Sequence, residues 1–69
     1  MAKFKCVMVH GKRWIDGNEY VGTPGGGDGC YNVLDENGAE WTIQPCEDGF
    51  YRYIPNKQAS ATFALVVPA

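Results

Sequence analysis

The sequence predicts an all-β protein: one small, partly open, five-stranded barrel formed by residues 1–69. Gly and Pro recur so often that no stretch keeps the 3.6-residue apolar period of a helix. Between them lie short runs rich in Val, Ile, Tyr, Phe, Trp and Thr, residues that favour strands. Turn pairs separate these runs and divide the chain into about five strands. These pairs are Asp16-Gly17, Pro24-Gly25, Asp28-Gly29, Asn37-Gly38 and Asp48-Gly49.

The first expected strand covers residues 3–9. Its alternation places Phe4, Cys6 and Met8 on one face and the two lysines on the other. Further along, residues 25–29 are rich in glycine but lack the Lys-Ser/Thr ending of a phosphate-binding loop. We expect a flexible hairpin tip there.

A hairpin is expected over residues 30–44. If residues 36–38 form a three-residue loop with Gly38 in the left-handed conformation, the pairing register follows. Val33 then lies opposite Trp41, and Tyr31 lies opposite Ile43. These four side chains share one face, so the pair is half-buried. The other face carries Asn32, Glu40 and Thr42.

The remaining strands are predicted at residues 50–54 and 62–67. Pro55 ends the first of them, and residues 56–60 make a polar crossing. The last strand places Phe63, Leu65 and Val67 on one face. We expect the two terminal strands to pair and to remove sheet edges that invite aggregation.

Length and cysteine content limit the setting in which the protein works. Sixty-nine residues make a single domain, and a 45% hydrophobic composition is enough for a core. Three cysteines, an odd number, do not suit a fully paired disulfide framework. No segment approaches the roughly 20 apolar residues needed to span a bilayer. We therefore expect a soluble protein in a reducing cytoplasm, with no membrane partner.

Charge is strongly segregated along the chain. All eight acidic residues lie between Trp14 and Tyr51, and the six Lys and Arg residues lie outside that stretch, so a net charge of only −2 hides an acidic middle. Such a polarity directs how a protein meets a charged partner, and it predicts a binding surface. The expected partner-binding residues are Trp14, Asp28, Asp35, Glu36, Glu40, Glu47, Asp48, Tyr51 and Tyr53.

No motif predicts catalysis, a metal or a cofactor. Cys6, His10, Cys30 and Cys46 are zinc-type ligands, but they include no close Cys-x-x-Cys pair. Nothing local marks an activated thiolate. The paired carboxylates at residues 35–36 and 47–48 belong to turns, whereas acid-base catalysis needs shielded groups. We expect no catalytic residue, so the protein is not predicted to be an enzyme.

Four segments together resemble a class of small bacteriophage and prophage proteins. They are Lys5-Cys6-Val7, residues 15–20, residues 31–43 with their Asp35-Glu36-Asn37-Gly38 turn, and residues 63–66. The resemblance implies an SH3-like barrel in the cytoplasm of a bacterial host, in a class whose role is often unknown. The chain departs from the pattern at residues 25–29 and 46–60.

The leading functional hypothesis is a non-catalytic accessory protein that binds a host or phage protein through its acidic surface. In a sharper form of this hypothesis, the protein inhibits its partner or mimics nucleic acid by occupying a basic groove. One alternative is single-stranded nucleic-acid binding through Trp14, Tyr51 and Tyr53, although six Lys and Arg residues make a short phosphate track. Another is a small structural component of a virion, since barrels of this size assemble into rings.

Overall fold

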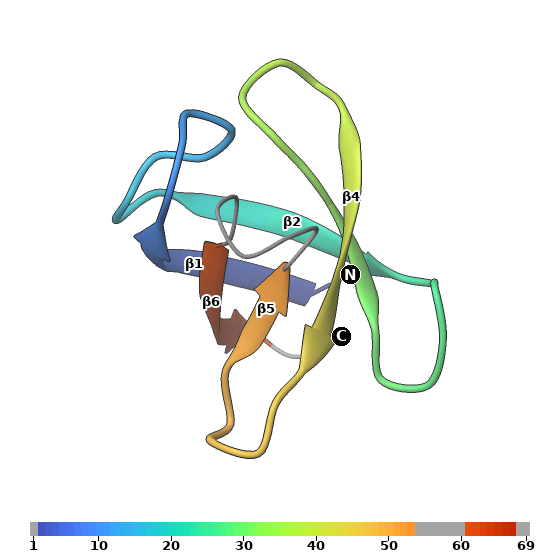
Figure 1. The fold of residues 1–69 in the computed structure, drawn as a ribbon. Coiled ribbons are helices and arrows are strands. Elements are labelled where there is room, and N and C mark those ends of the chain that lie inside the picture. Colours follow the sequence, from blue (N-terminus) through green and yellow to red (C-terminus); the bar gives the residue numbers. More distant parts are fainter. Residues whose placement is uncertain (1, 54–60, 68–69) are drawn as a thin grey trace.

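The protein is a closed antiparallel barrel of six strands (Figure 1). The computed structural model describes residues 2–53 and 61–67. Consecutive strands pair, and the last pairs back with the first. Among the described residues, no helix is long and apolar enough to cross a membrane. The strands are β1 (Ala2–Val9), β2 (Glu19–Pro24), β3 (Tyr31–Leu34), β4 (Glu40–Pro45), β5 (Tyr51–Tyr53) and β6 (Ala61–Val67).

The all-β prediction is confirmed, but the count of five strands and the partly open barrel are wrong. The short strand β5 pairs with β4 on one side and with β6 on the other. Together with the β1–β6 pairing, this closes the sheet. Closure therefore gives each of the six described strands a paired neighbour on both sides. The polar crossing expected at residues 56–60 lies outside the described residues, as does Pro55.

The β3–β4 hairpin has the predicted register. Val33 pairs with Trp41, and Tyr31 pairs with Ile43. Gly38 has a φ of 86°, in the left-handed region, and its N–H donates to the Asp35 carbonyl over 3.1 Å. The three-residue loop is therefore confirmed, since only a residue tolerant of positive φ completes this turn without strain.

A bulge in β1 overturns one part of the predicted alternation. Phe4 and Cys6 are fully buried, but Met8 is 57% exposed. The register with β6 shifts by one residue between Cys6 and Met8, so Val7 is an extra residue in β1. Such a bulge moves the following side chains to the other face, and Val9 packs against the core in place of Met8.

The prediction that Phe63, Leu65 and Val67 share a buried face of β6 is correct only for the beginning of the strand. Phe63 is buried, whereas Leu65 and Val67 are 38% and 46% exposed. A second shift in register separates the pair Phe4–Leu65 from the pair Lys3–Val67. Val67 therefore lies opposite the exposed Lys3, and the end of the strand leaves the core.

Aromatic rings fill most of the barrel interior. The ring of Phe4 lies edge-on to Tyr31 and Tyr51, with both centroid distances 5.0 Å. Trp14 comes from the loop between β1 and β2, is 3% exposed, and packs edge-on against Phe63 at 5.1 Å. Edge-to-face pairs of this kind add to the stabilisation from burial. The buried core is Ala2, Phe4, Cys6, Trp14, Val33, Ile43, Ala61 and Phe63.

Candidate protein-binding surface

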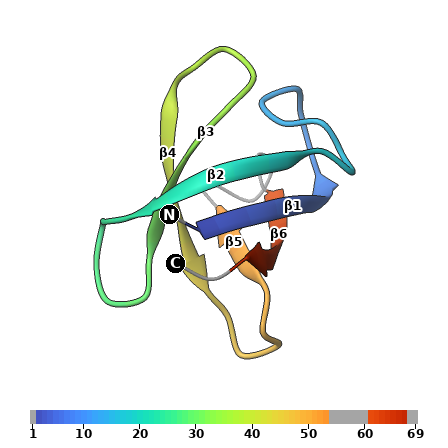
Figure 2. The same ribbon diagram turned by 180° about the vertical axis from the view of Figure 1, so that it is seen from behind.

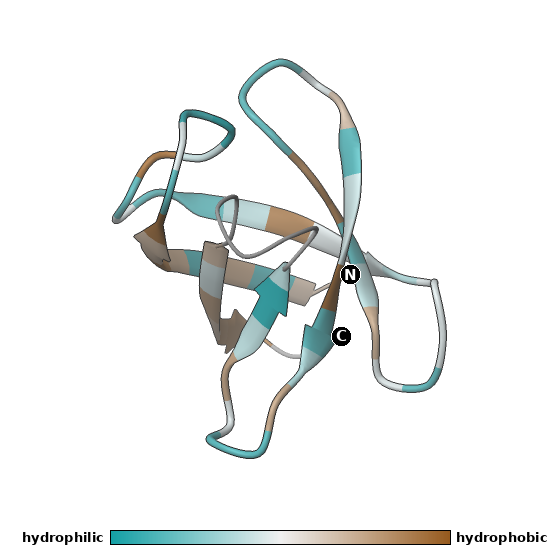
Figure 3. Cartoon of the chain, viewed as in Figure 1, coloured by the Kyte–Doolittle hydropathy of each residue, from teal (hydrophilic) through white to brown (hydrophobic). Residues whose placement is uncertain are grey.

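The loop between β1 and β2 lies beside the tip of the β3–β4 hairpin (Figures 1 and 2). The Glu36 backbone N–H donates to the Arg13 carbonyl over 2.9 Å. The indole N–H of Trp14 donates to the Leu34 carbonyl over 3.2 Å. The Trp14 ring is buried in the barrel core, so it anchors the loop to the barrel. We call the loop (residues 10–18) and the hairpin tip (residues 34–40) the loop–tip surface, which is hydrophilic at the tip (Figure 3).

Tyr20 joins three parts of the loop–tip surface. Its hydroxyl accepts the Ile15 backbone N–H over 2.8 Å and donates to the Glu36 carboxylate. The pKa of Tyr20 is raised above its ordinary value, first by burial and then by its hydrogen bond to Glu36. A strand residue therefore holds the loop and the hairpin tip together.

Asp35 shapes the hairpin tip from within. The side chain is 8% exposed, and one carboxylate oxygen accepts the backbone N–H groups of Asn37 and Ala39 over 2.8 and 2.9 Å. The other oxygen accepts the indole N–H of Trp41 over 2.7 Å. The hydrogen bond from Trp41 is the main reason that the pKa of Asp35 is lowered. Asp35, expected to bind a partner, uses its carboxylate to hold the turn.

Arg13 stacks on two half-buried aromatic rings. Its guanidinium carbon lies 4.1 Å from the centroid of Trp41 and 5.7 Å from that of Tyr53. The two rings contact each other, with centroids 5.2 Å apart and planes at 54°. Tyr53 was expected at a binding surface from the sequence, whereas Arg13 and Trp41 were not among the expected partner-binding residues. No local pattern signals this contact, because it joins the β1–β2 loop to β4 and β5.

Exposed acidic and apolar side chains occur side by side on the loop–tip surface. Asp16, Glu36 and Glu40 are exposed. Among the apolar residues, Ile15 is 50% exposed and Leu34 is 51% exposed, and Leu34 pairs with Glu40 across β3 and β4. Exposed apolar side chains among charged ones are typical of surfaces that bind proteins.

The other predicted acidic residues lie away from this surface. Asp28 is exposed in the β2–β3 loop, and Glu47 is exposed in the β4–β5 turn. These loops point away from the β3–β4 tip in Figures 1 and 2. The continuous acidic stretch of the sequence is therefore distributed over several turns of the barrel.

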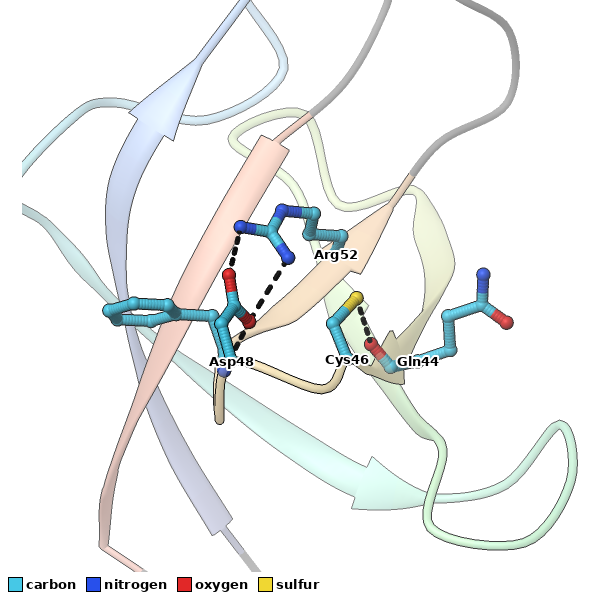
Figure 4. Close-up of polar contacts among 5 residues, drawn as sticks. Gln44, Cys46, Asp48 and Arg52 are labelled. Atoms are coloured by element: carbon cyan, nitrogen blue, oxygen red, sulfur yellow. Dashed lines mark hydrogen bonds and ion pairs between the residues drawn. The ribbon is translucent and has the colours of Figure 1, made fainter.

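Asp48 is held within the β4–β5 turn (Figure 4). Both of its carboxylate oxygens accept hydrogen bonds from the Arg52 guanidinium, and Oδ1 also accepts the Phe50 N–H over 3.1 Å. Arg52 is the main cause of the lowered pKa of Asp48. Beside them, the Cys46 thiol donates to the Gln44 carbonyl over 3.8 Å. Two acceptor oxygens matched to one guanidinium stabilise this turn.

The three predicted aromatic anchors differ in exposure. Trp14 is 3% exposed and belongs to the core, so it is not an exposed anchor. Tyr51 is half-buried and packs on Phe4 and Tyr31. Tyr53 is also half-buried and contacts Trp14 at 5.6 Å as well as Trp41. Alternation along the strands could not show this for Trp14, because Trp14 reaches the core from a loop.

The cysteines and other ligand-type residues form no group suited to a metal. Within residues 2–53 and 61–67, no three His, Cys, Asp or Glu side chains come together in that way, and no pocket is found. Cys6, Cys30 and Cys46 are free thiols. Cys6 is fully buried, and its burial raises the pKa of the thiol.

Comparisons with known protein families, with curated proteins and with solved structures give no match to the chain.

Proposed function

We propose that this chain is a non-catalytic accessory protein that binds a host or phage protein through its loop–tip surface. The barrel would be a variant of the SH3-like kind that the resemblance to small phage proteins implies, working in the cytoplasm of a bacterial host. In a sharper form of the proposal, binding would block the activity of the partner, either sterically or by mimicking nucleic acid.

The observation that supports this proposal most is the connection between the loop and the hairpin tip. A backbone hydrogen bond joins Glu36 to Arg13, and the Trp14 indole donates a hydrogen bond to β3. The Tyr20 hydroxyl makes hydrogen bonds to both the loop and the hairpin tip. Two loops held in this way lose little conformational freedom on binding, and preorganisation of that kind raises affinity.

The chemistry of the surface favours a basic partner. The exposed Asp16, Glu36 and Glu40 belong to the same loop–tip surface as Ile15 and Leu34, which supply apolar contact area. Charges at the rim of an interface speed association and suppress unsuitable partners. A basic groove or basic loop with apolar side chains at its centre fits this surface.

The test compares two charge-neutralised variants. The tagged protein is used to capture partners from nuclease-treated bacterial lysate, and the affinity of the identified partner is then measured. Asp16→Asn with Glu40→Gln should weaken binding about three- to tenfold, with a shallower salt dependence. The matched control, Asp28→Asn with Glu47→Gln, removes the same charge elsewhere and should change affinity less than about twofold. Equal losses in both variants would contradict a localised interface.

A second candidate function is single-stranded nucleic-acid binding. The observation in its favour is the stacked group of Arg13, Trp41 and Tyr53, with the exposed Lys12 next to it. Aromatic rings and guanidinium planes are common platforms for bases. Fluorescence anisotropy with labelled single strands at low salt separates the two functions: saturable binding at micromolar protein supports this candidate, and its absence removes it.

A structural role in a virion is the remaining alternative. It predicts a symmetric ring, whereas the proposed binding protein needs no self-assembly. Sedimentation velocity over a range of protein concentrations distinguishes the ring from a monomer.

A further inference from the structure

We infer that Trp41 and Tyr53 form a binding seat for an arginine side chain of the partner, and that Arg13 fills this seat in the free protein. The inference depends on the proposed function for its biological ligand, but the seat can be tested with a small molecule alone. We call the two rings the aromatic seat.

The geometry shows that the aromatic seat accepts a guanidinium group. The Arg13 carbon lies 4.1 Å above Trp41, well inside the roughly 6 Å range of a cation–π contact, and 5.7 Å from Tyr53. The rings are tilted by 54° to each other and make two walls of a corner. Arg13 is thus a ligand of the right chemistry already in place.

Asp35 makes the Trp41 wall more attractive to a cation. Its carboxylate accepts the indole N–H over 2.7 Å. A hydrogen bond to an anion polarises the indole and increases electron density on the ring face, and cations bind to that face through its negative quadrupole. The same bond fixes the orientation of the ring, so the seat persists when its occupant leaves.

The Arg13 side chain can leave without moving the loop. The loop is attached through the Arg13 backbone carbonyl, which accepts the Glu36 N–H, and through the buried Trp14. Neither ion pair among the described residues involves the Arg13 guanidinium. A half-exposed cation–π contact is weak enough for an incoming cation to replace.

The surroundings favour an arginine over an anionic group as the incoming ligand. Asp35 supports the seat, and the exposed Glu36, Glu40 and Asp16 belong to the same loop–tip surface. The same surface also carries Lys12 and Arg13, but its four carboxylates outnumber them, so an anion meets a net negative charge and a cationic side chain is attracted. Arginine also matches the flat faces of both rings better than lysine, because its guanidinium is planar.

The test uses N-acetylarginine amide as the probe and the Trp41 indole N–H as the reporter in NMR titrations. Arg13→Ala empties the seat, and Lys12→Ala is the matched control that removes one charge from the same loop. We expect a saturable shift in Arg13→Ala with an apparent affinity at least about tenfold higher than in the native protein or in Lys12→Ala. N-acetylcitrulline amide, which has nearly the same shape without the charge, should cause no saturable shift.

Three results would overturn the inference: no saturable shift in Arg13→Ala, equal affinity with and without Arg13, or an equal response to the citrulline probe. Arg13→Gln, which keeps a longer side chain over the rings, replaces Arg13→Ala if the alanine variant does not fold. If this titration fails while Asp16→Asn with Glu40→Gln still weakens partner binding, only the seat is refuted. If the titration succeeds and Asp16→Asn with Glu40→Gln leaves partner affinity unchanged, only the proposed interface is refuted.

Discussion

Replacing Gly22 with alanine tests how tightly the barrel interior is packed. Gly22 is buried on β2, where it pairs with Val33. A Cβ atom at this position would lie 2.6 Å from Cε2 and 2.9 Å from Cδ2 of Phe4, and 3.3 Å from Cγ1 of Val33. The Phe4 ring is fully buried with Tyr31 and Tyr51 each 5.0 Å away, so it has little room to move.

Two effects of opposite sign decide the magnitude. Overpacking of a well-filled core costs about 1–3 kcal/mol. Alanine in a strand is favoured over glycine by roughly 0.5–1 kcal/mol, because glycine loses more backbone freedom on folding. We expect the clash to win and Gly22→Ala to lower the free energy of unfolding by about 1–2 kcal/mol, which lowers Tm by about 5–15 °C for a domain of this size.

Urea and thermal unfolding measure this loss, and a double-mutant cycle with Phe4→Leu assigns its cause. Leucine lacks the Cε2 atom that a Cβ at residue 22 would meet, so Gly22→Ala should cost at least about 1 kcal/mol less in that background. Thr23→Ala, at an exposed neighbour on the same strand, should change stability by less than about 0.5 kcal/mol. An unchanged Tm in Gly22→Ala, or an equal cost in both backgrounds, would refute the packing argument.

Other expected outcomes concern hydrogen bonds and ionisation. Tyr20→Phe should destabilise the fold by about 1 kcal/mol in urea melts and speed amide exchange at Ile15, and unchanged exchange would contradict the connection between loop and tip. Because the pKa of Tyr20 is raised, its unfolded form ionises first, so stability should fall above about pH 10 and fall less in Tyr20→Phe. The lowered pKa values of Asp35 and Asp48 stabilise the fold above their ordinary range, and melts should show that contribution lost below about pH 4. Cys6 should react with Ellman's reagent much more slowly than the other two thiols, and equal rates would mean that the β1 strand opens readily.

Local patterning predicted the elements whose partners are close in the chain. The β3–β4 hairpin follows from alternation and from Gly38, because the loop length and the buried face select the same register. The bulge at Val7 was missed, since it arises where β1 meets β6 and a strand pattern alone contains no sign of it. The strand β2 (Glu19–Pro24) was missed for a similar reason, because its pairing with β1 and β3 defines it.

The candidate surface was predictable in its charge but not in its arrangement. Acidic residues were expected to meet a partner, and Glu36 and Glu40 are exposed beside the loop. Asp35 is next to Glu36 in the chain, yet its carboxylate is turned inward to Trp41. A one-residue difference in position separates a solvated charge from a structural one, because side chains around a tight turn point in different directions.

Composition and turn spacing alone determined that this chain is all-β and that its middle is acidic, because both properties depend on neighbouring residues. Tertiary structure decided that the barrel closes with six strands, that Trp14 is buried, and that Arg13 stacks on Trp41 and Tyr53. Each of these features depends on contacts between segments far apart in the sequence. Local patterns do not distinguish between the alternative side-chain positions, and the packing of the whole barrel selects one of them.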